Sequence, residues 1–205
     1  MYVVALTGGI GCGKTAATQV FAALGVPITD VDEISHALTA ANQPILKQIA
    51  AEFGAEFIDE NGALNRAKMR ELVFNDDVAR AKLNAILHPA IFEWAIGQLK
   101  QHANAPYQVL AIPLLFESPR YLPHVDKIVV LDCDEATQIA RVMARSDLTV
   151  LQVQKIIASQ TNRQIRLDSA DFVIKNDGNL SDLHQKICDF HEKVIKTCIL
   201  SKTIS

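Results

Sequence analysis

Cysteines, aromatic side chains and long apolar runs are all scarce in this sequence. The chain has 205 residues, of which four are cysteines and 6% are aromatic. Because the cysteines are irregularly spaced and include no Cys-x-x-Cys pair, the sequence predicts neither a disulfide framework nor a zinc module. No stretch approaches the roughly 18 consecutive apolar residues that cross a bilayer. We therefore expect a protein of a reducing compartment that has no membrane partner.

The sequence also lacks a leader and a strong charge of one sign. Residues 1–6 carry no basic leader, and Gly8 and Gly9 interrupt the apolar run, so no secretory signal peptide is predicted. The formal net charge of −3 argues against a protein that coats DNA or RNA. These absences predict a cytoplasmic protein without a nucleic-acid partner. We further expect a monomer or a weak homo-oligomer.

Apolar side chains, in contrast, are abundant at 49%, and charged side chains make up 21%. This balance is typical of one or two compact domains. A chain of this length buries roughly 70% of the surface that its unfolded form exposes, so a core can form without a disulfide or a structural metal.

Five short β-prone runs predict buried strands, and helix formers separate them. The runs are residues 2–7, 27–30, 107–112, 127–131 and 172–174. Helices are expected at 14–24, which Gly25 and Pro27 end, and at 180–200. Strands that alternate with helices are typical of a parallel α/β sheet.

Two helical insertions interrupt this alternation. In residues 32–103 apolar side chains recur at spacings of three and four, which indicates helices and, at this length, a small second domain. Residues 134–162 contain two helix starts, with Asp134 and Thr149 as N-caps and Gln152 completing a capping box, so a helical hairpin is predicted there. The core would then consist of residues 1–31, 104–133 and 163–205.

The most specific pattern is Gly-Gly-Ile-Gly-Cys-Gly-Lys-Thr at residues 8–15. It matches the phosphate-loop pattern of Gly, four residues, Gly, Lys and Ser or Thr, and it lies between a predicted strand and a predicted helix. Glycines let backbone N–H groups surround a phosphate chain, and the N-terminus of the helix adds positive charge. Lys14 would contact the β- and γ-phosphates, and the Thr15 hydroxyl would bind Mg²⁺.

Of two other interpretations of these glycines, one fails on spacing. A dinucleotide-binding Gly-x-Gly-x-x-Gly pattern starting at Gly9 would need a third glycine at Lys14, so it does not fit. A glycine-rich turn without a ligand is the remaining alternative.

Carboxylates near the ends of two predicted strands are candidates for the chemistry. Asp30 and Asp32 follow the second strand, at the edge where parallel sheets bind ligands. Either could accept a hydrogen bond from an attacking hydroxyl or hold water on Mg²⁺, or merely cap the next helix. Asp132 could be a Walker B aspartate, a role that we rank below that of Asp32 because a strand end leading into a helix cap explains it comparably well.

Arginines of the helical hairpin are candidates for binding phosphates. Arg141 and Arg145 lie four residues apart, so both guanidinium groups share one helix face. On a mobile lid they could clamp the transferring phosphate and exclude water. The alternative is a solvated helix face on which they pair with Asp134 or Asp147.

The remaining candidates carry weaker arguments. Arg163 and Arg166 repeat the idea of a phosphate clamp. His88, before Pro89 and among apolar residues, is typical of a buried, hydrogen-bonded structural histidine. Cys12 lies within the phosphate loop but has no catalytic base beside it in the sequence, so it is interpreted as a small spacer. No transition-metal site is proposed, since no second His or Cys lies at metal-ligand spacing from His88.

Taken in order along the chain, these motifs resemble the dephospho-coenzyme A kinase family. The stretches that carry the resemblance are Leu6–Gly11 with the phosphate loop, Asp30–Asp32, Leu83–Pro89, Pro113–Glu117, Gln138–Arg145, Ile157–Gln160 and Asn176–Gly178. The resemblance implies a three-layer P-loop NTPase fold of the α/β class, with a five-stranded parallel sheet, a helical coenzyme-A-binding domain at 32–103 and a lid at 134–162. It also implies the activity of the family, in which the γ-phosphoryl group of MgATP is transferred to the ribose 3′-hydroxyl of dephospho-coenzyme A.

The resemblance implies roles for individual residues as well. Asp32 would be the catalytic base, Lys14 and Arg141 would act on the transferring phosphate, and Thr15 would bind Mg²⁺. The ATP site would consist of Gly9, Ile10, Gly11, Cys12, Gly13, Lys14, Thr15, Ala16, Arg145, Asn176 and Gly178. The acceptor site would include Thr7, Asp32, Arg66, His88, Leu114 and Leu115. Cys12 and Thr15 depart from the family pattern, which usually has Ser at both positions.

Two rival functions share the phosphate loop. One is a kinase for another nucleotide or small metabolite, which would differ only in the acceptor pocket. The other is a regulatory switch in which ATP or GTP closes the lid without productive transfer. The absence of an Asn-Lys-x-Asp motif disfavours the GTP form of this switch, because the Asp of that motif pairs with guanine.

Overall fold

The computed structural model describes residues 1–203 of the chain, with side chains up to Cys198. Two compact units are distinguished by their internal contacts. The first consists of Met1–Asp30 and the chain from Leu99 onward, and the second is Val31–Gln98.

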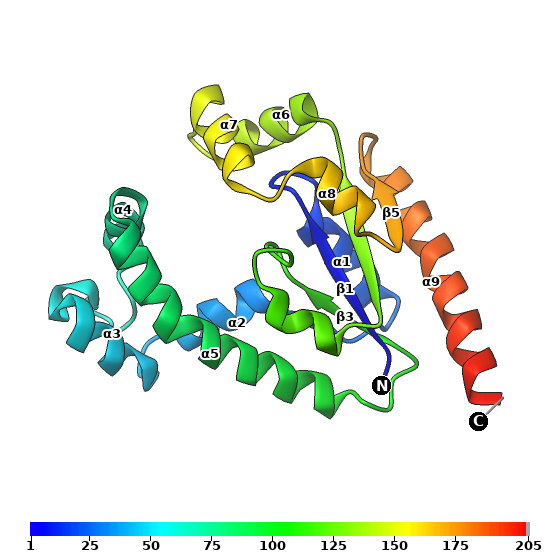
Figure 1. Ribbon diagram of the computed structural model, residues 1–205, viewed down its shortest axis with the longest axis horizontal. Coiled ribbons are helices and arrows are strands. Elements are labelled where there is room, and N and C mark those ends of the chain that lie inside the picture. The colour runs from blue at the N-terminus through cyan, green and yellow to red at the C-terminus, as the bar shows by residue number, and fades with distance from the viewer. Residues whose placement is uncertain (204–205) are drawn as a thin grey trace. The chain divides into compact units, whose positions relative to one another are not determined.

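The first unit is built on a five-stranded parallel sheet in the order β2-β3-β1-β4-β5 (Figure 1). Its strands are β1 (Val3–Gly8), β2 (Ile28–Asp30), β3 (Gln108–Ala111), β4 (Lys127–Asp132) and β5 (Phe172–Lys175). All six residues of β1 are buried, as expected for a central strand covered on both faces. The α/β class and the five strands predicted from the sequence are therefore confirmed.

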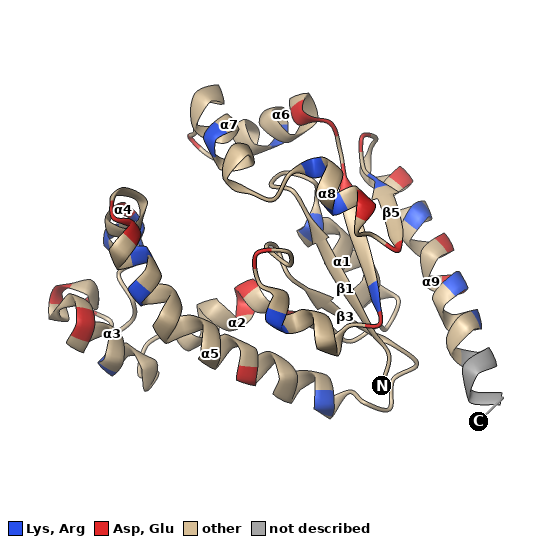
Figure 2. Ribbon diagram, viewed as in Figure 1, with Lys and Arg blue, Asp and Glu red and all other residues tan. Residues whose placement is uncertain are grey.

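Helices α1 (Lys14–Ala23) and α9 (Leu180–Thr203) pack together against the sheet. The rings of Phe21 and Phe190 meet edge to face, with centroids 6.0 Å apart, and both belong to the main hydrophobic core with Val4, Leu131 and Ile187. Acidic and basic residues are interspersed along α9 (Figure 2).

The predicted helical hairpin is present as α6 (Glu135–Arg145) and α7 (Val150–Ser159). Asp134 caps α6 by accepting a hydrogen bond from the Thr137 N–H at 2.6 Å, and Thr149 and Gln152 form the expected capping box. Helix α8 (Arg163–Asp168) follows and leads to β5. The short 3₁₀ helix η2 (Pro119–His124) precedes β4. That this hairpin moves as a lid stays a prediction.

The second unit is mainly helical. It contains α2 (Val31–Leu38), α3 (Ile45–Phe53), the short 3₁₀ helix η1 (Ala55–Phe57), α4 (Arg66–Asn75) and most of α5 (Asp77–Gln101). Its interior is formed by apolar side chains at helical spacing, among them Ile34, Ile45, Ile49, Met69, Leu83, Leu87 and Ile91. Among the described residues, no helix is both long and apolar enough to span a membrane.

Candidate functional site

The glycine loop between β1 and α1 has a backbone that only glycine accommodates. Gly11 and Gly13 have φ angles of +78° and +91°, in the left-handed region that L side chains rarely adopt. A Cβ at Gly13 would also collide with the amide nitrogen of Asn176, and one at Gly11 would lie 2.9 Å from the carbonyl oxygen of Gln138. Neighbouring elements thus approach the loop too closely for side chains.

Helix α1 begins directly after this loop. Gly13 is its N-cap, no side chain caps the helix, and the first turn contains no acidic residue, so the positive end of the helix dipole suits an anion. Lys14 lies in the same turn, with its ammonium nitrogen 3.9 Å from Asp30 Oδ2. Thr15 follows with an exposed side chain. A phosphate chain with Mg²⁺ would find a suitable set of donors here.

The two candidate carboxylates after β2 are in different surroundings. Asp30 is the last residue of that strand and forms the long ion pair with Lys14. Asp32 lies in the first turn of α2 and belongs to the second unit. Its position at a helix N-terminus is compatible with a capping role and with a role as a base.

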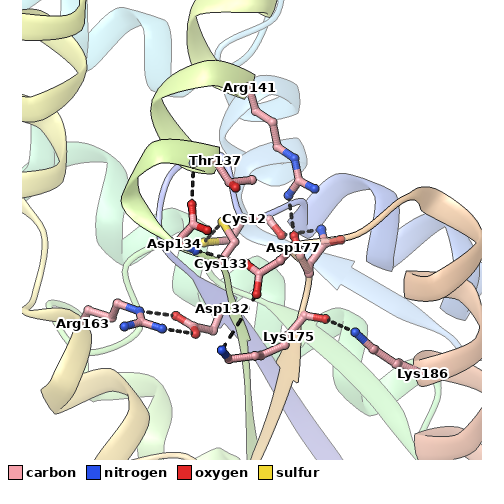
Figure 3. A network of polar contacts seen from close by, with 11 residues as sticks. Cys12, Asp132, Cys133, Asp134, Thr137, Arg141, Arg163, Lys175, Asp177 and Lys186 are labelled. Carbon is pink, nitrogen blue, oxygen red and sulfur yellow. Dashed lines mark hydrogen bonds and ion pairs between the residues drawn. The ribbon is translucent and has the colours of Figure 1, made fainter.

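Asp132, the candidate Walker B residue, is held by an arginine. Its carboxylate is buried at the end of β4 and accepts two hydrogen bonds from Arg163, Oδ1 to Nε at 2.7 Å and Oδ2 to Nη2 at 2.5 Å (Figure 3). The hydrogen bond to this carboxylate raises the pKa of Arg163 above its ordinary value. Since both oxygens are engaged, Asp132 anchors α8 to β4 and is a poor candidate for a metal ligand.

The donor set fits Mg²⁺ only if the nucleotide shares in binding it. Among the described residues, no cluster of three or more His, Cys, Asp or Glu side chains could hold a metal ion. Mg²⁺ is usually bound through one or two protein oxygens, substrate phosphates and water. The exposed Thr15 hydroxyl at the start of α1 suits that mode.

Arg141 has neither of the two predicted partners. Its guanidinium donates to two carbonyl oxygens, that of Asn176 at 2.8 Å and that of Gly178 at 3.2 Å, instead of pairing with an aspartate. The Asn176 amide in turn donates to the Cys12 carbonyl at 2.9 Å. Arg141 is therefore linked to the phosphate loop through one residue. Arg145 is exposed in the last turn of α6.

Asn176 and Gly178, both expected in the ATP site, follow β5, and Asn176 lies beside the loop. The Asn176 side chain is buried against Gly13 and Cys12. It therefore supports the loop backbone, a function that the sequence analysis did not assign to it.

Sequence reasoning missed two glutamines that hold the loop. The side chain of Gln138 in α6 donates to the Ile10 carbonyl at 2.6 Å, and the Ile10 N–H donates to the side-chain oxygen of Gln160 at 3.0 Å. The sequence does contain a signal for Gln138, because it shares the buried face of α6 with Val142, four residues on. Gln160 belongs to the stretch Ile157–Gln160 that carries the family resemblance, but nothing in the sequence assigned it a contact with the loop.

Arg166, a weak candidate from the sequence, lies close to the phosphate loop. It is buried, donates to the Thr161 carbonyl, and lies 3.0 Å from where a Cβ of Gly9 would stand. A guanidinium at this point adds positive charge beside the phosphate loop.

Three of the predicted acceptor residues lie in the first unit. Thr7 is buried in β1 and donates to the Pro113 carbonyl at 3.3 Å. Leu115 is fully buried, whereas Leu114 is 43% exposed. Of these two leucines, only Leu114 offers its side chain to a ligand without rearrangement.

Arg66 and His88 lie in the second unit, as does Asp32. Arg66 donates to the Thr39 hydroxyl at 2.7 Å and to the His36 carbonyl at 3.1 Å, and it lines an open pocket of about 480 Å³. His88 is half-buried on α5, so the expectation of a buried histidine is wrong. Leu87 and Ile91 occupy the buried face of α5 instead.

Comparisons with known proteins agree with this geometry. The sequence profile of the dephospho-CoA kinase family matches residues 2–182. A dephospho-CoA kinase of Burkholderia pseudomallei is 45% identical over 197 residues, 96% of this chain and 97% of that protein.

Two solved structures resemble the fold. The first is a dephospho-CoA kinase of Campylobacter jejuni, with a TM-score of 0.72 and 25% identity over 95% of this chain and 98% of that chain. The second is a shikimate kinase of Bacteroides thetaiotaomicron, with a TM-score of 0.52, 14% identity, and coverage of 94% and 98% of the two chains; it supports the fold alone. The profile match and the 45% identity over nearly the whole chain show that this chain belongs to the dephospho-CoA kinase family.

Proposed function

We propose that this protein transfers the γ-phosphoryl group of ATP to the ribose 3′-hydroxyl of dephospho-coenzyme A, giving coenzyme A and ADP. The reaction is the last step of coenzyme A synthesis. The observation that carries the proposal is the glycine loop with its two left-handed residues, followed at once by Lys14, in a chain whose family consists of dephospho-CoA kinases.

The residues of the first unit bind the donor. The amides of the loop and the first turn of α1 surround the phosphates of ATP, and Lys14 neutralises the β- and γ-oxygens. Thr15 would hold Mg²⁺, which supplies charge neutralisation on the transferring phosphate. Gln138 and Gln160 fix the Ile10 peptide groups, so the loop needs little reorganisation when the nucleotide binds.

Asp32 is the base of the proposed reaction. Its carboxylate accepts the proton of the 3′-hydroxyl and orients the oxygen for in-line attack on the γ-phosphorus. Arg141 and Arg145 supply positive charge to the transition state from α6. Arg66 and His88 contribute to the acceptor site, and the protein acts in the cytoplasm as a monomer or a weak homo-oligomer.

A panel of acceptors tests the proposal. ADP release is measured with MgATP and dephospho-coenzyme A, AMP, CMP, shikimate or gluconate in turn. We expect the highest kcat/KM with dephospho-coenzyme A. A higher kcat/KM with another acceptor would show that the proposed substrate is wrong, although the protein would still be a kinase. Slow ATP hydrolysis with no phosphorylated acceptor would instead favour the regulatory switch.

A further inference from the structure

Two thiols from distant parts of the sequence meet at the base of the phosphate loop. Cys12 belongs to the loop, and Cys133 follows the last residue of β4. Their sulfur atoms are 3.2 Å apart, and the Cys133 thiol donates a hydrogen bond to the Cys12 sulfur (Figure 3). Both residues are in the first unit, so the contact lies within one compact body.

The surroundings make the two thiols unequal. The hydrogen bond from Cys133 lowers the pKa of Cys12 despite its burial, and the charge of Arg166 acts in the same direction. The pKa of Cys133 is raised, since its proton is shared with Cys12 and the side chain is buried. Of the two, Cys12 is the better nucleophile, and Cys133 is the thiol placed in contact with it.

We propose that Cys12 and Cys133 are a reversible oxidation site that disables the phosphate loop. The Cys12 thiolate attacks hydrogen peroxide, which gives a sulfenic acid and releases hydroxide. The Cys133 thiol then attacks the sulfenic sulfur, forming the disulfide and releasing water with the thiol proton. Two electrons pass from the two thiols to one peroxide, and a dithiol reductant reverses the step.

The disulfide would disturb the loop directly. A disulfide bond is about 2.05 Å long, so the sulfurs must approach by about 1 Å from their present 3.2 Å. Side-chain rotation supplies part of this approach, and the remainder moves the Cys12 backbone, whose N–H donates to the Gly9 carbonyl at 3.1 Å and whose carbonyl accepts from Asn176 at 2.9 Å. A displacement of Cys12 is therefore passed to the amides that surround the phosphates.

The other two cysteines offer an internal control. Cys188 and Cys198 both lie in α9, and in the structure neither is disulfide-bonded. Cys188 is more exposed than Cys12 or Cys133, so exposure alone would favour its oxidation. The proposal instead predicts that the intramolecular disulfide forms between the two buried thiols.

Peroxide titration of the full-length protein tests the site. We expect intact mass to fall by about 2 Da, and peptide mapping without reduction to link the Cys12 and Cys133 peptides. Because misplacement by about 1 Å can cost on the order of 10²-fold in rate, kinase turnover should fall by that order and return with dithiothreitol. Oxidation confined to Cys188, or a disulfide that leaves turnover unchanged, would overturn the proposal.

Variants separate the disulfide from general damage. In the reduced state, Cys133→Ala and Cys133→Ser should have normal turnover. After peroxide treatment their mass should not fall by about 2 Da, because oxidation should stop at a sulfenic acid on Cys12, which dimedone traps. Cys188→Ser should behave as the wild type. If either Cys133 variant folds and still forms an intramolecular disulfide, the pairing is wrong.

The proposal rests on the proposed function only for its activity readout. Mass and peptide mapping report the disulfide in a protein of any activity. A reduced wild type without kinase activity would contradict the proposed function, whereas missing linkage in an active enzyme would contradict the oxidation site alone.

Discussion

At the scale of single residues, the phosphate loop depends on the absence of side chains. Gly13 combines a φ of +91° with the close approach of Asn176. Gly25, after α1, has a similar φ of +78° but nothing within 4 Å of its missing Cβ. A side chain at Gly25 would therefore cause backbone strain alone, whereas one at Gly13 would cause both backbone strain and a steric collision.

Replacing each of them with alanine measures that difference. Gly25→Ala should cost about 1 kcal/mol in the free energy of unfolding, the strain of a left-handed L residue. Gly13→Ala should cost clearly more, and it should also weaken ATP binding because the Asn176 side chain must move. Urea unfolding and calorimetry with MgATP measure both. Equal costs for the two variants, with ATP binding intact, would contradict this account of the loop.

The role of Asp32 is tested by a change that keeps its shape. Asp32→Asn removes the basic carboxylate oxygen but keeps the size and shape of the side chain. Turnover should therefore fall by about 10²- to 10⁴-fold while ATP affinity changes little. Asp30→Asn is the matched variant, since Asp30 contacts Lys14 and should affect ATP binding more. Near-normal turnover of Asp32→Asn would remove Asp32 from the role of base.

The loop was predictable at this scale, but its supports were not. The glycines, Lys14 and Thr15 are close together in the sequence, so a local pattern was sufficient to predict the phosphate loop. The contacts of Gln160 and Arg166 with the loop join residues about 150 positions apart, and no local pattern encodes such a contact. The second thiol beside Cys12 was missed for the same reason.

At the scale of elements, two ion pairs join neighbours at the β4 side of the sheet. Arg163 joins α8 to the end of β4 through Asp132. Lys127 and the Ile128 N–H join the start of β4 to Asp171, just before β5. The two pairs differ in burial, so they should differ in their contribution to stability.

Removing Arg163 leaves a buried carboxylate without its partner. The Asp132 side chain is 4% exposed and that of Arg163 is 47% exposed, so solvent screens the pair in part. We expect Arg163→Met to cost about 1–3 kcal/mol in unfolding free energy. In a double-mutant cycle with Asp132→Asn, the second change should recover part of the loss. Strict additivity would mean that the two side chains do not interact.

The Asp171 pair gives a pH dependence with a defined sign. Partial burial acts to raise the pKa of Asp171, but hydrogen bonds from Lys127 and the Ile128 N–H outweigh it and the pKa is lowered. Ionised Asp171 therefore stabilises the fold above the unfolded-state pKa of about 4, and the contribution is lost as pH falls through the lower, folded-state pKa.

Thermal unfolding of Asp171→Asn tests this sign. The wild type should be more stable than the variant at neutral pH, and the difference should shrink as the pH falls below about 4. In a Lys127→Met background, the loss of stability caused by Asp171→Asn at neutral pH should be smaller, because one hydrogen bond to Asp171 is already absent. A difference that grows on acidification would contradict the assignment.

Elements themselves were largely predictable. Each of the five strands was located to within one residue at either end, and both hairpin caps were identified, because turn chemistry and apolar periodicity are local properties. The alternative in which Arg141 pairs with an aspartate was wrong, since its partners depend on where the loop after β5 lies. Pro89 lies inside α5, with the buried side chains Leu87 and Ile91 on either side of it.

At the scale of the whole molecule, one unit carries the phosphate loop and the other carries Asp32 and Arg66. The candidate acceptor residues are divided between the two units, because Thr7, Leu114 and Leu115 belong to the first. The parallel sheet followed from the alternation of strands and helices, whereas the assignment of the acceptor required the resemblance to a family. No property of composition distinguishes dephospho-coenzyme A from another alcohol.

The most direct test follows the phosphoryl group itself. The enzyme is given γ-labelled ATP with Mg²⁺ and dephospho-coenzyme A, and the position of the label in the product is determined, with Lys14→Met as the matched variant. The account predicts label on the 3′-oxygen of coenzyme A, with formation strongly reduced by the Lys14 change. Label only in inorganic phosphate, or transfer that does not depend on Lys14, would contradict it.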